Sequence, residues 1–147
     1  MDARPEAHNG FTLLEVIVVL LLVAVLGAVV VPRIGTIGAG VRAEAELLRA
    51  NLRFVQALAI TGNTATWSVQ VEPGAYRVLR NGNPAPTTLP DEAGPARVLP
   101  PAVRIVSGTG AIVFDAHGAP ASTVSIVLSD GQRNETVTVI GFTGLIP

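Results

Sequence analysis

The side chain best placed to do chemistry in this sequence is Glu15, a carboxylate inside a long apolar run. Between Phe11 and Val31 only Thr12 and Glu15 are strongly polar. A carboxylate at the centre of a membrane helix costs about 2.5–3.5 kcal/mol, and less near a helix end. If the chain were cut after Gly10, Phe11 would carry a new α-amino group four residues from Glu15. The spacing therefore predicts that the carboxylate of Glu15 pairs with this positive charge, on its own chain or on a neighbouring chain.

Asp115 and His117 are the other pair whose spacing suggests chemistry, because an acid, a histidine and a serine can form a catalytic triad. No motif fixes that geometry, and Asp115 lies in a turn pattern where aspartate accepts backbone hydrogen bonds. Asp115, His117 and Asp130 are also candidate metal ligands, but the sequence has neither zinc nor EF-hand spacing. Gly108-Thr109-Gly110 lacks the third glycine of a phosphate loop. The sequence therefore predicts a protein that is not an enzyme and that has no cofactor or metal site.

The apolar run predicts a helix that crosses a bilayer. Its 21 residues from Phe11 to Val31 span roughly 31 Å, and nothing charged follows Glu15 until Arg33. A simpler alternative to charge pairing is that Glu15, near the end of this helix, reaches the water at the membrane surface. A cleaved secretory signal would need a shorter apolar core and a nearby small-x-small site, which the sequence lacks. An uncleaved single-pass anchor remains the alternative.

The residues that follow the apolar run predict a hinge. Pro32 is followed by three glycines, Gly35, Gly38 and Gly40. Proline and glycine both disfavour helix interiors, so this segment is expected to bend or to melt locally. A hinge here would let the C-terminal part pivot during assembly. A simple joint next to the membrane is the alternative.

A second, amphipathic helix is predicted from Val41 to about Thr61. Its apolar residues recur at alternate spacings of four and three, which is typical of one helix face packed on a sheet. Charged and amide side chains, including Glu44 and Asn51, are assigned to the other faces. Gly62-Asn63 ends the pattern. The apolar face consists of Val41, Ala45, Leu48, Leu52, Val55 and Ala59.

From Thr64 the apolar period changes to two, which predicts β-strands. Their length and spacing favour an antiparallel meander. The segment from Pro84 to Pro101 holds six of the eleven prolines and predicts a loop without regular structure. Such a loop either contacts a partner or is simply variable. The expected strands cover 64–71, 76–80, 103–106, 111–114, 123–128 and 135–140.

Composition and charge exclude some classes of protein. The chain of 147 residues has no cysteine, so no disulfide stabilises it. Its net charge is −1, and residues 33–147 hold nine Arg against eight Asp or Glu, a balance of +1. Neither value indicates a nucleic-acid-binding surface.

Gly10 followed by Phe11-Thr12-Leu13-Leu14-Glu15 and a long apolar helix resembles the class III signal of type IV pilins and type II secretion pseudopilins. The resemblance implies that the prepilin peptidase cleaves between Gly10 and Phe11 and that Phe11 is N-methylated. It also implies that Glu15 pairs with the N-terminus of an adjacent subunit during assembly on an inner-membrane platform. Pro32 lies where many pilins carry a helix-loosening proline. The leader departs from the family in carrying less positive charge.

The second half is similar to the GspH/FimT group of minor pilin-like proteins. The resemblance implies an α+β, pilin-like fold, in which a long N-terminal helix, apolar and then amphipathic, packs on a small antiparallel β-domain. The matching segments are 112–115, 124–128, 137–139 and 143–144, with Gly118, Pro120 and the helix that begins Arg42-Ala43-Glu44-Ala45. The implied parts are a cytoplasmic leader (1–10), a transmembrane and assembly helix (11–32), a hinge with the amphipathic helix (33–62) and a periplasmic β-domain (63–147).

The resemblance implies a minor pseudopilin of a type II secretion pseudopilus, which supports protein export across the outer membrane. Such a protein is a single-pass protein of the bacterial inner membrane with its C-terminal domain in the periplasm, and its helix packs with other pseudopilins or pilins. The alternative is a FimT/FimU-like minor pilin of a type IV pilus that takes part in DNA uptake. That role needs a basic surface, to which Arg97, Arg104 and Arg133 contribute modestly. A third reading is an anchored periplasmic domain unrelated to pili.

Overall fold

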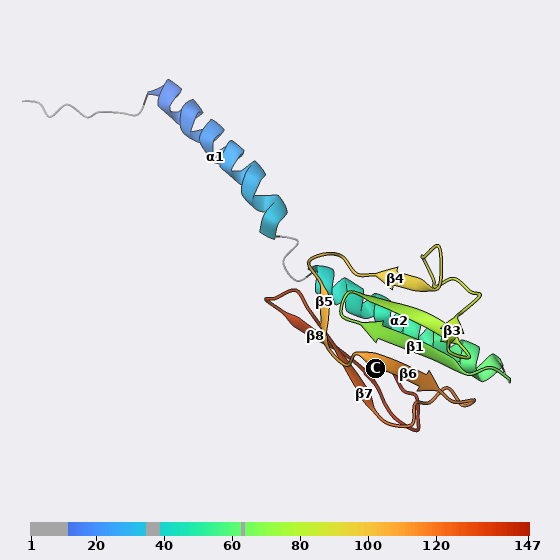
Figure 1. The fold of residues 1–147 in the computed structure, drawn as a ribbon. Coiled ribbons are helices and arrows are strands. Elements are labelled where there is room, and N and C mark those ends of the chain that lie inside the picture. Colours follow the sequence, from blue (N-terminus) through green and yellow to red (C-terminus); the bar gives the residue numbers. More distant parts are fainter. Residues whose placement is uncertain (1–11, 35–38, 63) are drawn as a thin grey trace, which may run out of the picture. The chain divides into compact units, whose positions relative to one another are not determined.

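The computed structural model describes residues 12–34, 39–62 and 64–147, and it leaves the side chains from 26 to 39 outside the description. The chain divides into two compact units, Met1–Ile37 and Gly38–Pro147 (Figure 1). The first unit contains helix α1. The second contains helix α2 and all the described strands.

Helix α1 runs from Leu13 to Ile34. Its backbone passes Pro32 and ends two residues later. From Thr12 to Val25 every side chain is exposed. Among the residues whose side chains are described, no helix is both long enough and apolar enough to cross a bilayer. Phe11 and the side chains of 26–32, which the predicted membrane helix includes, lie outside the described set.

Helix α2 runs from Ala39 to Thr61 and includes Gly40. The predicted apolar face is confirmed, because all six of its residues are at most 4% exposed. Burial of each larger apolar side chain contributes roughly 1.5–3 kcal/mol, so this face anchors the helix to the strands. The N–H of Gly62 donates to the carbonyl of Leu58 and closes the last turn at 2.8 Å.

The strands form two antiparallel sheets. The first sheet has the order β3-β2-β1-β6, with β4 also paired to β2, and the second has the order β5-β7-β8. Helix α2 packs against β1 of the first sheet and against β7 and β8 of the second, so the core lies between the helix and both sheets (Figure 1). The bounds are β1 Trp67–Glu72, β2 Ala75–Arg80, β3 Asn83–Pro84, β4 Ala96–Val98, β5 Arg104–Ser107, β6 Gly110–Phe114, β7 Val124–Ser129 and β8 Asn134–Val139.

The six expected strands exist, but their expected arrangement as a meander was wrong. The consecutive strands β5 and β6 belong to different sheets, and β6 returns to pair with β1. The turn between them allows this change of sheet because Gly108 has a φ of 80° and lies against β7. A Cβ at Gly108 would come within 2.3 Å of the carbonyl oxygen of Ser125, so only glycine fits there.

The expected loop between Pro84 and Pro101 was also wrong in part. Asn81 and Gly82 both have positive φ, which makes a tight hairpin that places β3 beside β2. The chain then leaves the sheet and returns as β4, where Arg97 pairs with Tyr76. Leu89 and Leu99 are buried in the core cluster. This segment therefore covers the outer edge of β2 and contributes to the core.

Candidate assembly site

Glu15 lies in the first turn of α1, and its side chain is exposed. Its backbone N–H donates to Oγ1 of Thr12 at 3.3 Å, so Thr12 caps the helix. A Thr followed three residues later by Glu is the capping-box pattern, which gives Glu15 a second possible role within its own chain. Within the described residues its carboxylate has no ion-pair partner. Glu15 lines a shallow hollow on the surface of α1 together with Val16, Val19 and Leu20.

Of the other predicted assembly residues, the structure describes only the backbone of Pro32. Gly10, Phe11, Gly35 and Gly38 lie outside the described residues. Pro32 lies in the last turn of α1. The cleavage site and the hinge therefore stay predictions.

Asp115 has the turn role that its sequence context indicates. Its Oδ1 accepts hydrogen bonds from the backbone N–H groups of His117 and Ala119, each at 2.9 Å. The bond from Ala119 is the main cause that lowers the pKa of Asp115 below its usual value. The Nδ1 of His117 lies 3.9 Å from Oδ2 of Asp115, and both side chains are more than half exposed.

Asp130 is held in the same way in another turn. Its Oδ1 accepts from the N–H groups of Gln132 at 2.9 Å and Arg133 at 2.7 Å, and the bond from Gln132 contributes most to lowering its pKa. In the described part of the chain, no three residues among His, Cys, Asp and Glu are grouped as a metal site would require. Both aspartates shape turns.

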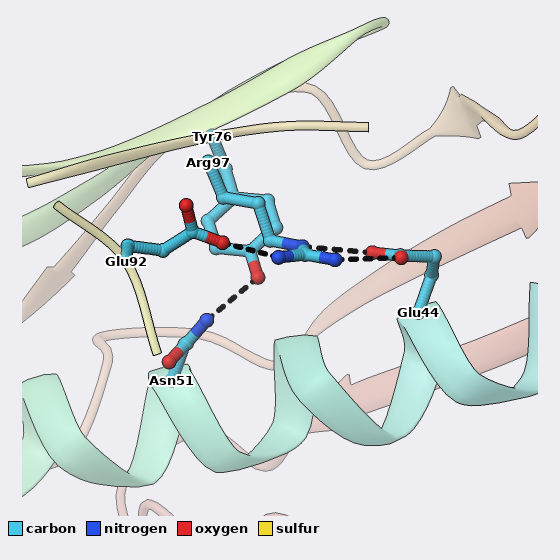
Figure 2. A network of polar contacts seen from close by, with 5 residues as sticks. All are labelled: Glu44, Asn51, Tyr76, Glu92 and Arg97. Atoms are coloured by element: carbon cyan, nitrogen blue, oxygen red, sulfur yellow. Dashed lines mark hydrogen bonds and ion pairs between the residues drawn. The ribbon is translucent and has the colours of Figure 1, made fainter. Parts of the chain in front are cut away.

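A network of polar contacts joins the β4 segment to helix α2, as Figure 2 shows. The Nε and Nη2 of Arg97 donate to both carboxylate oxygens of Glu44, at 2.9 and 2.7 Å. The Nη1 of Arg97 forms an ion pair with Glu92. The bond to Glu44 is the main cause that raises the pKa of Arg97. Arg97 thus ties a strand, a loop and a helix together through one guanidinium group.

Tyr76 and Asn51 extend this network into the core (Figure 2). The Nδ2 of Asn51 donates to the Tyr76 hydroxyl at 2.7 Å. Tyr76 is 1% exposed, and this burial raises its pKa to about 12. The Nδ2 of Asn51 and the hydroxyl of Tyr76 are both buried among apolar residues, and each satisfies the other through this hydrogen bond.

The sequence pattern did not predict this network. It assigned Glu44 and Asn51 to the polar faces of the helix, but they are only 5% and 2% exposed. Their positions in the sequence could have indicated this burial. Glu44 and Asn51 are seven residues apart, so they lie on the same side of the helix, next to Ala45 and Leu52 of the apolar face. For Arg97 the sequence held no signal, since its partner Glu44 lies 53 residues away.

Comparison with protein families finds two matches that divide the chain between them. The family described as type II transport protein GspH matches residues 44–143. The prokaryotic N-terminal methylation motif matches residues 7–31. No curated protein sequence matches the chain significantly.

Comparison with solved structures finds the type IV minor pilin FimU of Pseudomonas aeruginosa PAO1 in two crystal forms. The P21 form has a TM-score of 0.53 at 12% identity and covers 73% of this chain and 86% of FimU. The P65 form has a TM-score of 0.52 at 14% identity and covers 72% of this chain and 90% of FimU. At this identity the likeness concerns the fold alone.

The fold and the N-terminal motif together define a pilin-like protein, with an α+β architecture in which a helix packs on antiparallel sheets. More narrowly, because the match to type II transport protein GspH spans most of its length, the chain belongs to the GspH family.

Proposed function

We propose that this protein is a minor pseudopilin of a type II secretion pseudopilus and supports protein export across the outer membrane. The carrying observation is that one chain joins an N-terminal methylation motif at 7–31 to a GspH domain at 44–143. In this role the prepilin peptidase cuts between Gly10 and Phe11, and Phe11 is then methylated. The apolar helix holds the protein in the inner membrane, with the C-terminal domain in the periplasm. The protein acts as a structural subunit and performs no catalysis.

The described part of α1 supports assembly through helix packing. From Leu13 to Val25 every side chain except Glu15 is apolar, and all of them are exposed in the isolated chain. Such a helix can leave the bilayer only by packing against other apolar helices. Glu15 then sets the register, because its carboxylate is best neutralised by the amino group of an adjacent subunit.

Substitutions at Glu15 separate this role from helix capping. We expect Glu15→Ala to be processed normally and incorporated poorly into the pseudopilus. Glu15→Gln keeps the capping-box pattern but removes the charge. If the charge sets the register, Gln incorporates as poorly as Ala, whereas wild-type incorporation of the Gln variant would assign Glu15 to capping alone. Immunoblots of sheared filaments and of membranes measure incorporation and processing.

A second candidate function is that of a minor pilin in a type IV pilus, which the structural likeness to FimU favours. A part in DNA uptake would need a basic surface. Of the three arginines that the sequence predicts for this surface, Arg97 is engaged by Glu44 and Glu92. Arg104 and Arg133 are exposed. DNA binding by the full chain that weakens steeply with salt would favour this candidate, and absence of binding at low salt would remove the DNA role.

A further inference from the structure

Strand β6 has one edge that the described residues leave unpaired. Its first edge pairs with β1. The outer edge of β2 is covered by β3 and β4. The outer edge of β8 receives a hydrogen bond from Arg49 to the carbonyl of Thr136 at 2.9 Å. At β5, the N–H of Ile105 donates to Pro73 at 2.9 Å.

The register shows which main-chain groups of β6 are free. The N–H of Asn81 donates to the carbonyl of Thr66, so even-numbered residues of β1 bond to β2. The odd-numbered residues of β1 therefore bond to β6, at Gly110, Ile112 and Phe114. Ala111 and Val113 direct their N–H and C=O groups to the outer edge. Within the described residues, none of these groups has a partner.

The chain itself begins to cover this edge and then departs from it. The N–H of Asp115 donates to the carbonyl of Ala119 at 3.0 Å, which forms one antiparallel rung beside β6. The next residue, Pro120, has no N–H, and its carbonyl accepts from the N–H of Phe142 at 3.0 Å. The returning segment is thus held by the C-terminal loop and not by β6.

A groove remains between the outer edge of β6 and the returning segment. It has a volume of about 200 Å³, and its lining holds no charged side chain. The strand from Gly110 to Phe114 also lacks the charges and prolines that usually protect an open edge. Val113 is 48% exposed. The groove is lined by Ala111, Ile112, Val113, Pro120, Ala121, Ser122 and Val124.

We propose that the outer edge of β6 receives an extended segment of an adjacent filament subunit, which adds as an antiparallel strand opposite Ala111 and Val113. This inference rests on the proposed function, since it names the contact between neighbouring subunits. The antiparallel direction continues the rung that Asp115 and Ala119 already form. Main-chain pairing supplies affinity, as in other cases of strand addition.

The groove also specifies the chemistry of the incoming segment. In an antiparallel pair the residue opposite Ile112 points to the same face as Ile112, which is 2% exposed and belongs to the apolar core. The neutral lining favours an aliphatic side chain there, with uncharged neighbours on either side. A second copy of this chain, paired through its own β6, would form a closed two-fold contact that cannot extend a filament. The occupant is therefore a different surface of a neighbouring subunit.

Hydrogen exchange tests this contact directly. The full chain in detergent micelles is compared with the full chain in sheared filaments that contain the other subunits. In micelles the amides of Ala111 and Val113 exchange quickly, while that of Ile112 is protected by β1. In filaments we expect exchange at Ala111 and Val113 to slow by about tenfold or more, as expected for amides that gain a partner. Unchanged exchange in filaments that contain the chain would overturn the proposal.

A proline substitution tests the same contact without disturbing the pairing of β6 with β1. Val113→Pro removes only the outward N–H, and prolines are tolerated at edge positions whose N–H faces away from the sheet. We expect its incorporation into filaments to fall by about tenfold, as for the loss of a hydrogen bond that leaves a buried carbonyl unpaired. Val113→Thr keeps the N–H and the branched side chain, and it should incorporate normally. Thermal unfolding in detergent must show that both variants are folded.

The possible outcomes are distinct. Normal incorporation of a folded Val113→Pro variant would refute strand addition. A concentration-dependent dimer of the purified chain, with protection of both amides, would identify a second copy as the occupant and overturn the proposal. If the wild-type chain enters no filament at all, the proposed function fails first. Incorporation without protection at Ala111 and Val113 rejects this inference alone.

Discussion

At the scale of single residues, Arg97 joins β4 to helix α2 through its ion pair with Glu44, the most buried ion pair that the described residues form. It lies between two carboxylates, and its partner Glu44 keeps only 7% of its side chain exposed. An ion pair of this kind is neutral in stability when intact, but removal of one partner leaves an uncompensated buried charge. Arg97 is therefore more important for holding β4 in place than its position on a short edge strand suggests.

Two arginines on paired strands allow a matched comparison of this effect. Arg77 pairs with Glu72 at 2.9 Å, and both side chains are about half exposed. We expect Arg97→Ala to lower the free energy of unfolding by about 3 kcal/mol. Arg77→Ala should lower it by less than about 1 kcal/mol. Chemical denaturation of both variants measures the difference, and equal losses would show that burial of the Arg97 network has no energetic weight.

Tyr76 offers a direct reading of burial because it is the single tyrosine of the chain. Burial raises its pKa from 10.0 to about 12. The folded state thus holds the Tyr76 proton more tightly than the unfolded state. The stabilisation that comes from the protonated Tyr76 is complete below pH 10, and it is lost as the pH rises towards 12. The loss amounts to about 1.4 kcal/mol per pH unit within that window.

Absorbance of tyrosinate in the folded protein should accordingly show a midpoint near pH 12. The Tyr76→Phe variant should lose this alkaline dependence of the free energy of unfolding between pH 10 and 12. A midpoint near pH 10 in the folded chain, or the same pH dependence in the Phe variant, would mean that Tyr76 is not buried as described.

At the scale of elements, regular patterns were predictable and irregular ones were not. The spacing of apolar residues predicted the buried face of α2, because a helix repeats its environment every few residues. The many prolines from Pro84 onward predicted a loop and not the strands β3 and β4. Both strands are short, and both are stabilised by pairing with β2, which the local sequence does not show. The pairing of β6 with β1 depends on contacts between distant segments, which no local pattern encodes.

The polar side of α2 has a structural role that its sequence pattern did not reveal. Arg53 donates to the carbonyl of Ile146 at 2.7 Å. Gln56 donates to the carbonyls of Gly118 and Gly144, at 2.7 and 2.8 Å. The bonds to Ile146 and Gly144 fix the C-terminal segment to the helix, and the bond to Gly118 fixes the turn after β6. The chain has no cysteine that could form a disulfide there.

At the scale of the whole molecule, the sequence predicted the class of protein better than it predicted the contacts. Glu15 could be identified because a carboxylate in an apolar run is costly and therefore conspicuous. The edge of β6 that the described residues leave unpaired could not be identified, because only the pairing of the other strands shows which edge remains. The two compact units correspond to the two family matches. The first unit carries the N-terminal methylation motif, and the second carries the GspH domain.

The most direct test of the central claim is mass spectrometry of the protein after photo-crosslinking in cells from a position in the C-terminal domain. We predict that the N-terminal peptide begins at methylated Phe11 and that the crosslinked partners are other pseudopilins. Crosslinks to pilus subunits would assign the protein to a type IV pilus. An intact Met1–Gly10 leader, with no pilin-like partner, would contradict the claim that this protein is a filament subunit.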